Sequence, residues 1–464
     1  MFQTEQKVVP RSVWGKFART RWVMVWFTQL LYYGTAWLQY NGRQALLFDL
    51  EARRFYLGPL VFYPQDFIYL TGLLVIAALS LFLFTAVAGR LWCGYACPQT
   101  VYTEIFMWFE RKIEGDRNDR LRRAAGSWTL DRTGRAVAKN AVWLLFAAWT
   151  GLTFVGYFTP IRELTDAALQ FSLGPWEMFW IVFYSAATFG NAGFMREQVC
   201  KYMCPYARFQ SAMFDKDTLL VTYDQARGEP RGSRSRKADP QSLGLGACVD
   251  CNLCVQVCPT GIDIRKGLQY ECIGCAACVD VCDQVMDKMN YPRGLVKYST
   301  QNGLLGQWSV AQMWRRAFRP RVLVYTAVVW GLIVAMAIAI AVRHDLRVDV
   351  LRDRGVNFRL AEDGVIENVY RLNLMNASEH PLQVSVALKP LASGMRVMET
   401  QHLVVKSTES RWVVIHVQAD PEAVRPGSNT IVFEIHSTRQ PVSSIQQATG
   451  HDVIEESAVF LAPR

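Results

Sequence analysis

Histidine is scarce, and the first 343 residues contain none. Among 464 residues there are six histidines: His344, His380, His402, His416, His436 and His451. Since helical bundles commonly hold haem iron through histidine, this distribution excludes a histidine-ligated haem among the apolar segments described below. No glycine-rich phosphate loop follows a strand-like segment either, so direct binding of a nicotinamide dinucleotide is not expected.

Charge is missing from long stretches of the chain. Five segments of at least 18 residues contain no Asp, Glu, Lys or Arg: residues 22–42, 67–88, 140–159, 178–195 and 322–342. Each is long enough to cross about 30 Å of hydrocarbon as a helix. Two of them, 67–88 and 322–342, are apolar on every face, which suits lipid. The sequence therefore predicts a polytopic α-helical membrane protein of about five transmembrane helices. No small-residue cleavage site follows the first span, so we expect it to be retained.

The net charge of +10 is unevenly distributed along the chain. Segments 1–21, 90–139 and 196–321 hold 33 Lys and Arg against 19 Asp and Glu, whereas the other loops and the tail hold 17 against 21. An excess of basic residues marks the cytoplasmic side of a membrane protein. The charge therefore indicates topology and no nucleic acid partner. The charge distribution places the N-terminus on the cytoplasmic side of the membrane and the region from residue 343 on the opposite side.

No cysteine lies in the external tail. The twelve cysteines are Cys93, Cys97, Cys200, Cys204, Cys248, Cys251, Cys254, Cys258, Cys272, Cys275, Cys278 and Cys282. By the predicted topology, all lie at or beyond the cytoplasmic ends of spans. A disulfide framework requires the opposite placement, because cytosolic thiols stay reduced. Metal or redox chemistry is the better expectation.

Eight of the cysteines form a repeated pattern, C-x2-C-x2-C-x3-C-P and then, thirteen residues later, C-x2-C-x2-C-x3-C. This is the pattern of bacterial ferredoxins with two [4Fe-4S] clusters, in which the fourth cysteine of each run serves the other cluster. The pattern predicts Cys248, Cys251, Cys254 and Cys282 as ligands of one cluster. It predicts Cys272, Cys275, Cys278 and Cys258 as ligands of the other. Zinc is the rival, but zinc sites usually take paired C-x2-C couples.

The remaining four cysteines form two C-x3-C-P motifs, at Cys93 and Cys97 and at Cys200 and Cys204. Each motif follows an even-numbered span, so the chain contains two similar halves, which are commonly related by a pseudo-twofold axis. On a helix, positions i and i+4 share a face, and four thiols can converge between the halves. Thiolates select Cu(I), zinc or iron–sulfur species, and a pair can also cycle through a disulfide. The sequence alone does not choose among these.

The rest of the chain completes the domain organisation. Residues 343–464 contain about seven short alternating runs typical of an immunoglobulin-like sandwich. A Gly, Ser, Pro and Arg-rich stretch indicates a flexible linker. The predicted segments are a cytoplasmic N-terminal segment (1–21), a four-helix bundle with both C-x3-C-P motifs (22–222), the linker (223–247), a 2[4Fe-4S] ferredoxin domain (248–298), an interfacial segment (299–321), a fifth transmembrane helix (322–342) and a periplasmic β domain (343–464).

The order of these features resembles the CcoG family, also called FixG or RdxA, the accessory proteins of cbb3-type cytochrome c oxidase assembly. The resemblance spans essentially the whole chain and includes the stretches GRLWCGYACPQT, CKYMCPYARFQSAMFD and CVDCNLC. It implies a bacterial inner-membrane protein that reduces Cu(II) to Cu(I) for the copper centre of the oxidase. It makes Cys93, Cys97, Cys200 and Cys204 the candidate copper-binding and catalytic residues. The chemistry is compatible, since thiolates favour Cu(I).

Two other functions stay open at this point. One is a quinol-linked ferredoxin-type electron carrier, because membrane subunits of nitrate and nitrous-oxide respiration combine the same motifs. The other is a nonenzymatic scaffold whose β domain docks oxidase subunits. The expected partners are membrane lipid, a separate cytoplasmic electron donor, copper, and oxidase subunits or assembly factors. A homodimer is a further option.

Overall fold

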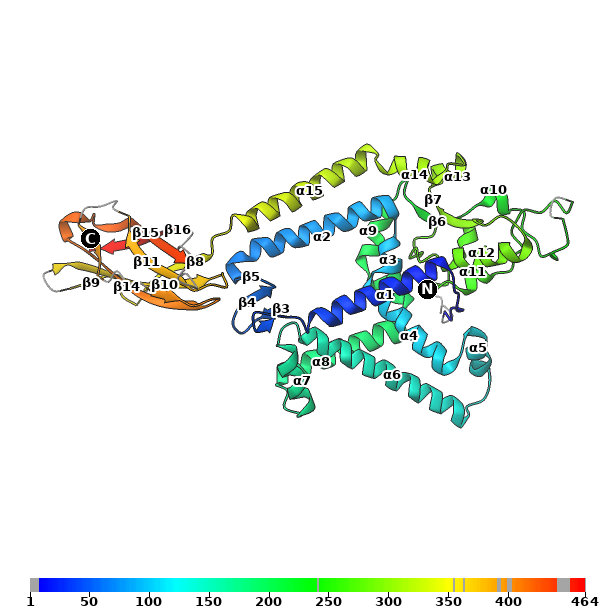
Figure 1. Cartoon of the computed structure of the whole chain (residues 1–464), viewed down its shortest axis with the longest axis horizontal. Coiled ribbons are helices and arrows are strands. Elements are labelled where there is room, and N and C mark those ends of the chain that lie inside the picture. Colours follow the sequence, from blue (N-terminus) through cyan, green and yellow to red (C-terminus); the bar gives the residue numbers. More distant parts are fainter. Residues whose placement is uncertain are drawn as a thin grey trace, which may run out of the picture. The chain divides into compact units, whose positions relative to one another are not determined.

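The computed structural model describes residues 8–239, 242–353, 355–361, 364–389, 394–398, 403–439 and 451–463. The chain divides into two compact units. The first contains Met1–Leu38 and Tyr69–Ala335, and the second contains Gln39–Ile68 and Met336–Arg464. Figure 1 shows the helices of the first unit and the strands of the second.

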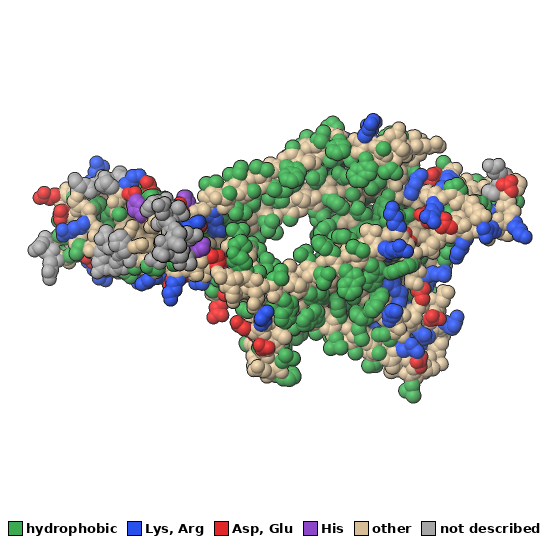
Figure 2. Space-filling model, viewed as in Figure 1, with side chains coloured by type: hydrophobic (Ala, Val, Ile, Leu, Met, Phe, Trp, Pro, Cys, Tyr) green, Lys and Arg blue, Asp and Glu red, His purple; other side chains and the backbone are tan. Residues whose placement is uncertain are grey.

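Each predicted span corresponds to a helix, although two boundaries differ. The helices are α1 (Lys16–Thr35), α2 (Phe67–Ala88), α6 (Leu130–Val155), α8 (Pro175–Thr188) and α15 (Pro320–Ala341). Within the described residues, three segments are long and apolar enough to cross a membrane: Pro64–Ala88, Leu130–Val155 and Pro320–Ala341. Figure 2 shows the apolar side chains that cover these helices in the first unit. The five-span count stays a prediction.

The first predicted span, 22–42, is wrong at both ends. Helix α1 begins at Lys16 and ends at Thr35, and the chain then forms a hairpin of β1 (Gln39–Tyr40) and β2 (Arg43–Gln44). Its two loop residues, Asn41 and Gly42, both have positive φ. An Asn-Gly pair is the preferred loop for such a hairpin and cannot continue a helix. The fourth span also departs from a regular helix, because α8 continues as the π-helix η2 (Phe189–Met195).

The two C-x3-C-P motifs have the same local structure. In the first motif, the short helix α3 (Leu91–Tyr95) precedes Cys97 and the new helix α4 (Pro98–Glu114) follows it. In the second motif, the π-helix η3 (Val199–Met203) precedes Cys204 and the new helix α9 (Pro205–Met213) follows it. Cys97 and Cys204 are the extended N-caps of these new helices. The prediction that each pair lies on one continuous helix is therefore wrong. Proline disfavours helical conformation in the residue before it and suits the first helical position.

Shorter elements complete the first unit. They are α5 (Arg117–Ala125), α7 (Ile161–Leu169), β6 (Leu220–Tyr223), α10 (Gln225–Gly228), α11 (Leu253–Gln256), η4 (Ile264–Lys266), α12 (Ala277–Met289), β7 (Val296–Ser299), α13 (Gln301–Leu305) and α14 (Val310–Ala317). Strands β6 and β7 pair antiparallel and bracket the ferredoxin domain. The predicted linker is partly tied to that domain, because Arg234 donates hydrogen bonds to the carbonyls of Gly246 and Cys248.

The second unit contains a β-sandwich with one continuous apolar core. One sheet has the order β12-β14-β10-β8, with β9 paired to β10, and the other has the order β13-β11-β15-β16. The strands are β8 (Leu346–Arg352), β9 (Arg359–Leu360), β10 (Ile366–Asn376), β11 (Leu382–Leu388), β12 (Met395–Val397), β13 (Leu403–Val405), β14 (Ser410–Ala419), β15 (Gly427–Arg439) and β16 (His451–Ala462). The two-sheet architecture predicted for this region is confirmed.

The loop between the first two spans also belongs to the second unit, which the sequence did not indicate. It forms a three-stranded sheet of β3 (Leu46–Asp49), β4 (Arg54–Leu57) and β5 (Leu60–Phe62). The hydroxyl of Tyr63 donates to the carbonyl of Asn376 at 3.0 Å. The buried carboxylate of Asp66 pairs with Arg343 at 2.7 Å and with Arg347 at 3.0 Å. These contacts fasten the loop to the sandwich.

Candidate functional site

The eight ferredoxin cysteines line two separate cavities. Cys248, Cys251, Cys254 and Cys282 line one of them. Cys258, Cys272, Cys275 and Cys278 line the other, together with Cys254. The fourth cysteine of each run therefore lies with the first three of the other run, which is the crossed arrangement expected from the spacing. Helix α12 carries Cys278 and Cys282 one turn apart and so contributes to both cavities.

The two cysteine loops repeat one unusual backbone conformation. In the first loop, Asp250 and Asn252 have φ of 49° and 57°, and at the same offsets in the second loop Gly274 and Ala276 have φ of 68° and 55°. Left-handed residues turn successive backbone N–H groups toward one point, which suits an anionic group such as an iron–sulfur cluster. The donor set and the loop geometry thus fit a [4Fe-4S] cluster in each cavity.

Arg265 fastens the first loop from behind. Its guanidinium, 8% exposed, donates to Asp250 and Asn252 at 2.6 Å and to Asp263 at 2.8 Å. The hydrogen bonds from Arg265 in turn hold the pKa of Asp263 below its usual range. Because the guanidinium is charged, these bonds are stronger than hydrogen bonds between neutral groups. Sequence reasoning missed this arginine, which has no motif of its own.

Burial keeps the thiols of Cys254, Cys272 and Cys282 protonated. It raises the pKa of Cys254 to about 11 and the pKa of Cys272 and Cys282 to about 12. A cluster binds thiolates, so assembly must release protons from these cysteines. The positive charge of iron offsets the cost of burying the sulfur atoms as anions.

The C-x3-C-P cysteines form a second group, here called the four-cysteine nest: Cys93, Cys97, Cys200 and Cys204. Burial is the main cause that raises the pKa of Cys93 to about 11 and the pKa of Cys200 to about 12. The charge of Cys97 is the next cause for both thiols. The structure therefore brings together the thiols of both halves. Cys93 also donates a hydrogen bond to Oε1 of the buried Gln210 at 3.4 Å. Gln210 lies on α9, six residues after Cys204, and sequence reasoning missed it.

The nest lies directly against the second cluster loop. A Cβ atom added to Gly94, between Cys93 and Cys97, would lie 2.8 Å from the carbonyl oxygen of Ile273 and 2.9 Å from the backbone of Cys275. Only glycine permits this approach. Cys93 and Cys200 also pack against the apolar core of the ferredoxin domain. Arg90 lies in the same region, where its buried guanidinium donates to the carbonyls of Tyr270 and Ala207.

A buried ion cluster supports the helix that follows the first C-x3-C-P motif. The carboxylate of Glu110 on α4 is fully buried and pairs with Arg120 at 2.8 Å and Arg196 at 2.9 Å. Gln99, two residues after Cys97, donates to the carbonyls of Asn191 and Arg196. These bonds join the helix that follows the first motif to the segment that precedes the second.

The described part of the chain contains no group of three His, Cys, Asp or Glu side chains arranged to hold a single metal ion. This applies to the nest and to the ferredoxin cysteines alike. Cluster ligands are spaced more widely than the ligands of one ion, because they surround a cube of irons. For the nest, the sulfur atoms must draw together if one copper ion is to bind.

Comparison with known protein families matches three parts of the chain. A "4Fe-4S binding domain" family matches residues 70–115, and a "4Fe-4S dicluster domain" family matches residues 195–301. A family described as "IG-like fold at C-terminal of FixG" matches residues 336–463. All twelve cysteines fall within the two iron–sulfur matches. The chain is therefore a ferredoxin-type iron–sulfur protein with an immunoglobulin-like C-terminal domain.

Curated relatives match most of the chain. Nitrogen fixation protein FixG of Rhizobium meliloti is 39% identical over 430 residues, which cover 86% of this chain and 82% of the relative. In Cereibacter sphaeroides, protein RdxB is 41% identical over 81% of this chain and 80% of its own length, and protein RdxA is 40% identical over 85% of both. This chain belongs to the FixG/RdxA family.

Proposed function

We propose that the protein is a membrane-bound iron–sulfur electron carrier that reduces Cu(II) to Cu(I) at the four-cysteine nest. The Cu(I) product would serve assembly of the copper centre of a cbb3-type oxidase. The observation that carries this proposal is the contact between the turn at Gly94 and the loop at Cys275, which leaves no room for a side chain between nest and ferredoxin.

The ferredoxin cysteines would hold two clusters, one in each cavity. Cys248, Cys251, Cys254 and Cys282 would hold the first, and Cys258, Cys272, Cys275 and Cys278 would hold the second. When bound, each cluster supplies one electron at a time. The surrounding apolar side chains, among them Val257, Ile264 and Val281, exclude water from the cavities. Exclusion of water lets the protein set the reduction potential.

The nest would bind copper as its substrate. One electron converts Cu(II) to Cu(I), and soft sulfur ligands favour the Cu(I) product. Burial raises the pKa of Cys93, Cys97 and Cys200, so binding of the metal must displace their protons. The hydrogen bond that Cys93 donates to Oε1 of Gln210 holds the side chain of Cys93 in place before copper arrives.

The test is a double variant, Cys97→Ser with Cys204→Ser, compared with the native protein. Both proteins are purified anaerobically, reduced with dithionite, freed of reductant and mixed with Cu(II) and a Cu(I)-specific chelator. We expect the variant to keep its iron and lose Cu(I) formation. Undiminished Cu(I) formation with a full iron content would exclude the nest as the reduction site.

Docking of oxidase subunits would be a separate task of the β-sandwich. The observation that favours it is an exposed apolar pair on one strand, Trp412 and Val414, which are 55% and 50% exposed on β14. Changing both to serine should leave Cu(I) formation intact and impair oxidase assembly in cells. If assembly is unaffected, this strand is not the docking surface.

A further inference from the structure

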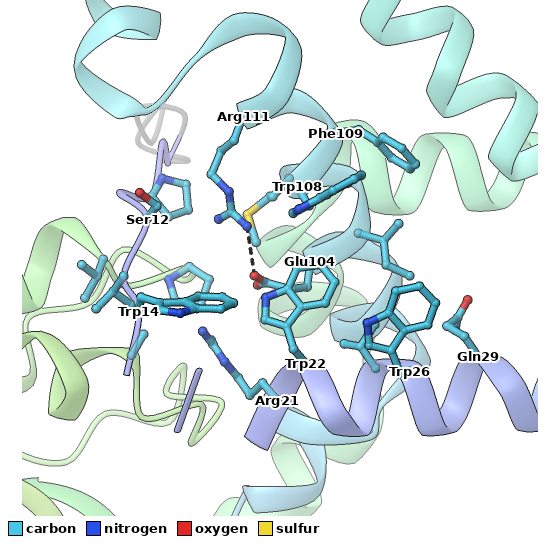
Figure 3. A pocket seen from close by; sticks show the side chains of 18 of the residues that line it. Ser12, Trp14, Arg21, Trp22, Trp26, Gln29, Glu104, Trp108, Phe109 and Arg111 are labelled. Atoms are coloured by element: carbon cyan, nitrogen blue, oxygen red, sulfur yellow. Dashed lines mark hydrogen bonds and ion pairs between the residues drawn. The ribbon is translucent and has the colours of Figure 1, made fainter. Parts of the chain in front are cut away.

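A large aromatic cavity lies in the first unit beside the ferredoxin domain (Figure 3). Its volume is about 660 Å³, and it lies among α1, α4, α6, residues 10–14 and the loop at Pro259. The side chains that dominate its wall are Trp14, Trp22, Trp26, Trp108, Phe109 and Trp149. Cavities that bind organic ligands have this size and this apolar lining, with a few polar groups that fix orientation.

Three polar side chains enter this aromatic cavity. Arg21 is 8% exposed and Glu104 is 9% exposed, and Figure 3 shows both facing the space between the indole rings. Glu104 accepts a hydrogen bond from Arg111 at 3.2 Å. Within the described residues, Nε of Arg21 and Oε1 of Gln29 have no hydrogen-bond partner. An unused buried donor and an unused buried acceptor are costly unless a ligand satisfies them.

The inner wall of the cavity touches the second cluster site. Val257, Pro259 and Ala277 line the cavity, and these residues are the direct neighbours of Cys258 and Cys278. A ring bound in the cavity would thus lie one residue away from two proposed cluster ligands. The outer wall belongs to α1, where Trp26 is 63% exposed on an apolar helix face. Such a cavity suits a molecule that enters from lipid and carries a polar ring.

We propose that this cavity binds an isoprenoid quinol and that the quinol is the electron donor of the protein. The proposal rests on the proposed function, because it supplies the electrons that the clusters pass to copper. Arg21 donates a hydrogen bond to one ring oxygen, and Oε1 of Gln29 accepts one from a ring hydroxyl. The indole rings of Trp22 and Trp108 stack near the quinol ring, as aromatic side chains do with flat ligands.

The reaction balances with two copper ions for each quinol. The quinol loses two protons and two electrons and becomes a quinone. The clusters that the eight ferredoxin cysteines would hold would supply one-electron transfer, so the two electrons of one quinol would reduce two Cu(II) ions to Cu(I). The carboxylate of Glu104 accepts the first proton and passes it to solvent, and the second proton follows the same route. Glu104 suits this task because its carboxylate is a proton-accepting group among the residues that line the cavity.

The first test measures binding without copper and without turnover. Decylubiquinone is titrated into the full-length protein in lipid nanodiscs, and tryptophan fluorescence is recorded, since quinones quench nearby indoles. We expect saturable quenching that Arg21→Leu weakens at least 10-fold and Gln29→Leu weakens several-fold. The matched control is Arg19→Leu, which removes an exposed charge from the same helix outside the cavity. Iron content and circular dichroism show that each variant is folded.

The second test measures electron entry. Decylubiquinol is added anaerobically without copper, and bleaching of the visible cluster absorbance is followed. We expect bleaching in the native protein and in Arg19→Leu, and at least a 10-fold slower rate in Arg21→Leu. Equal quenching by Arg21→Leu and the native protein would overturn the quinol site. Quenching without bleaching would overturn the role of the quinol as donor.

The two proposals fail in different ways. If the cavity does not bind quinol, the native protein reduced by dithionite still forms Cu(I). If the nest does not reduce copper, decylubiquinone still quenches tryptophan fluorescence and decylubiquinol still bleaches the clusters. A short-chain phosphatidylcholine is added as a competitor of the quinone. If it removes all quenching by the quinone, the cavity holds a lipid chain, and this result would also overturn the quinol site.

Discussion

The carboxylate of Asp280 on the ferredoxin helix α12 accepts a hydrogen bond from the backbone N–H of Ala18 at 2.7 Å, in the first turn of α1. A second bond comes from the N–H of Phe17 at 3.1 Å. Asp280 therefore caps a helix that lies 262 residues earlier in the sequence. Its negative charge also complements the positive end of the α1 dipole. Gly15 permits this contact, because a Cβ atom there would lie 2.4 Å from the Asp280 carboxyl group.

Loss of this cap should loosen α1 from the ferredoxin domain. Asp280→Ala leaves two buried N–H groups without an acceptor, so we expect it to destabilise the protein by about 1–3 kcal/mol. Asp280→Asn retains one acceptor oxygen and should cost less. The measurement is thermal loss of cluster absorbance in detergent. Asp287→Ala on the same helix is the control, since its pair with Arg293 is exposed and should contribute little to stability. A similar transition for all three variants would contradict the capping role.

Cysteine spacing predicted which four cysteines line each ferredoxin cavity, because the two runs repeat with short, fixed spacers. The same spacing predicted one continuous helix for Cys93 and Cys97, which was wrong. Pro98 follows directly and makes Cys97 an extended N-cap. This departure is visible in the sequence once the conformational restriction before proline is applied.

Other parts of the site have no local signal. Arg21 and Ala277 line one cavity although 256 residues separate them, and neither belongs to a motif. Gln210 reaches Cys93 only because the two halves of the bundle pack together. The loop that carries Tyr56 and Val61 resembles an ordinary connection, and its attachment to the sandwich depends on tertiary packing. Contacts of this kind follow from the fold and not from a pattern of residues.

The buried ion cluster at Glu110 should be essential for stability. Glu110→Gln leaves Arg120, Lys139 and Arg196 without their shared carboxylate, and an uncompensated buried charge costs about 3–5 kcal/mol. We expect a lower thermal midpoint in detergent and faster loss of nest-dependent Cu(I) formation on heating. Asp131→Asn is the matched control, because the Asp131–Arg135 pair is exposed on α6. An equal midpoint for both variants would show that the cluster at Glu110 is not structural.

The N-terminal segment should detach from the first unit at low pH. Asp116 accepts hydrogen bonds from the N–H and hydroxyl of Ser12 at 3.0 and 2.7 Å. Burial alone would raise the pKa of Asp116, but the bonds from Ser12 and from the N–H of Arg117 outweigh burial and lower it below 3.8. A carboxyl group whose pKa is lower in the folded state than in the unfolded state stabilises the folded state. This stabilisation is fully present when the pH is above the pKa of the unfolded state, and it is lost as the pH falls through the pKa of the folded state.

Hydrogen exchange of residues 9–14, corrected for intrinsic rates, would measure this effect. We expect protection to be constant from pH 7 to the ordinary pKa of aspartate and to fall below it. Asp116→Asn should reduce protection already at pH 7 and remove most of the pH dependence. If the variant keeps the native pH dependence, another group controls the segment.

Iron analysis of cysteine pairs would test the crossed ligand arrangement. Cys258→Ser should remove one cluster and lower the iron content from about eight to about four per chain. Adding Cys275→Ser should remove no further iron, because both residues line the same cavity. Adding Cys251→Ser should remove the second cluster, because Cys251 lines the other cavity. The reverse result, with iron lost on adding Cys275→Ser and kept on adding Cys251→Ser, would show that each run holds its own cluster.

Gly94→Ala should separate the nest from the second cluster loop without removing a ligand. Its Cβ atom would collide with the carbonyl of Ile273 and the backbone of Cys275, and neither backbone group can rotate away. Overpacking of this kind costs about 1–3 kcal/mol and shifts the backbone. We expect a full iron content, normal bleaching by reductant and slower Cu(I) formation. Gly134→Ala on α6 is the control, since nothing lies within 4 Å of its added Cβ and alanine favours a helix. The two substitutions add the same atom, so a slower rate of Cu(I) formation in Gly94→Ala alone would assign the effect to the contact between the nest and the loop. Equal rates of Cu(I) formation in both variants would mean that electrons reach copper by another route.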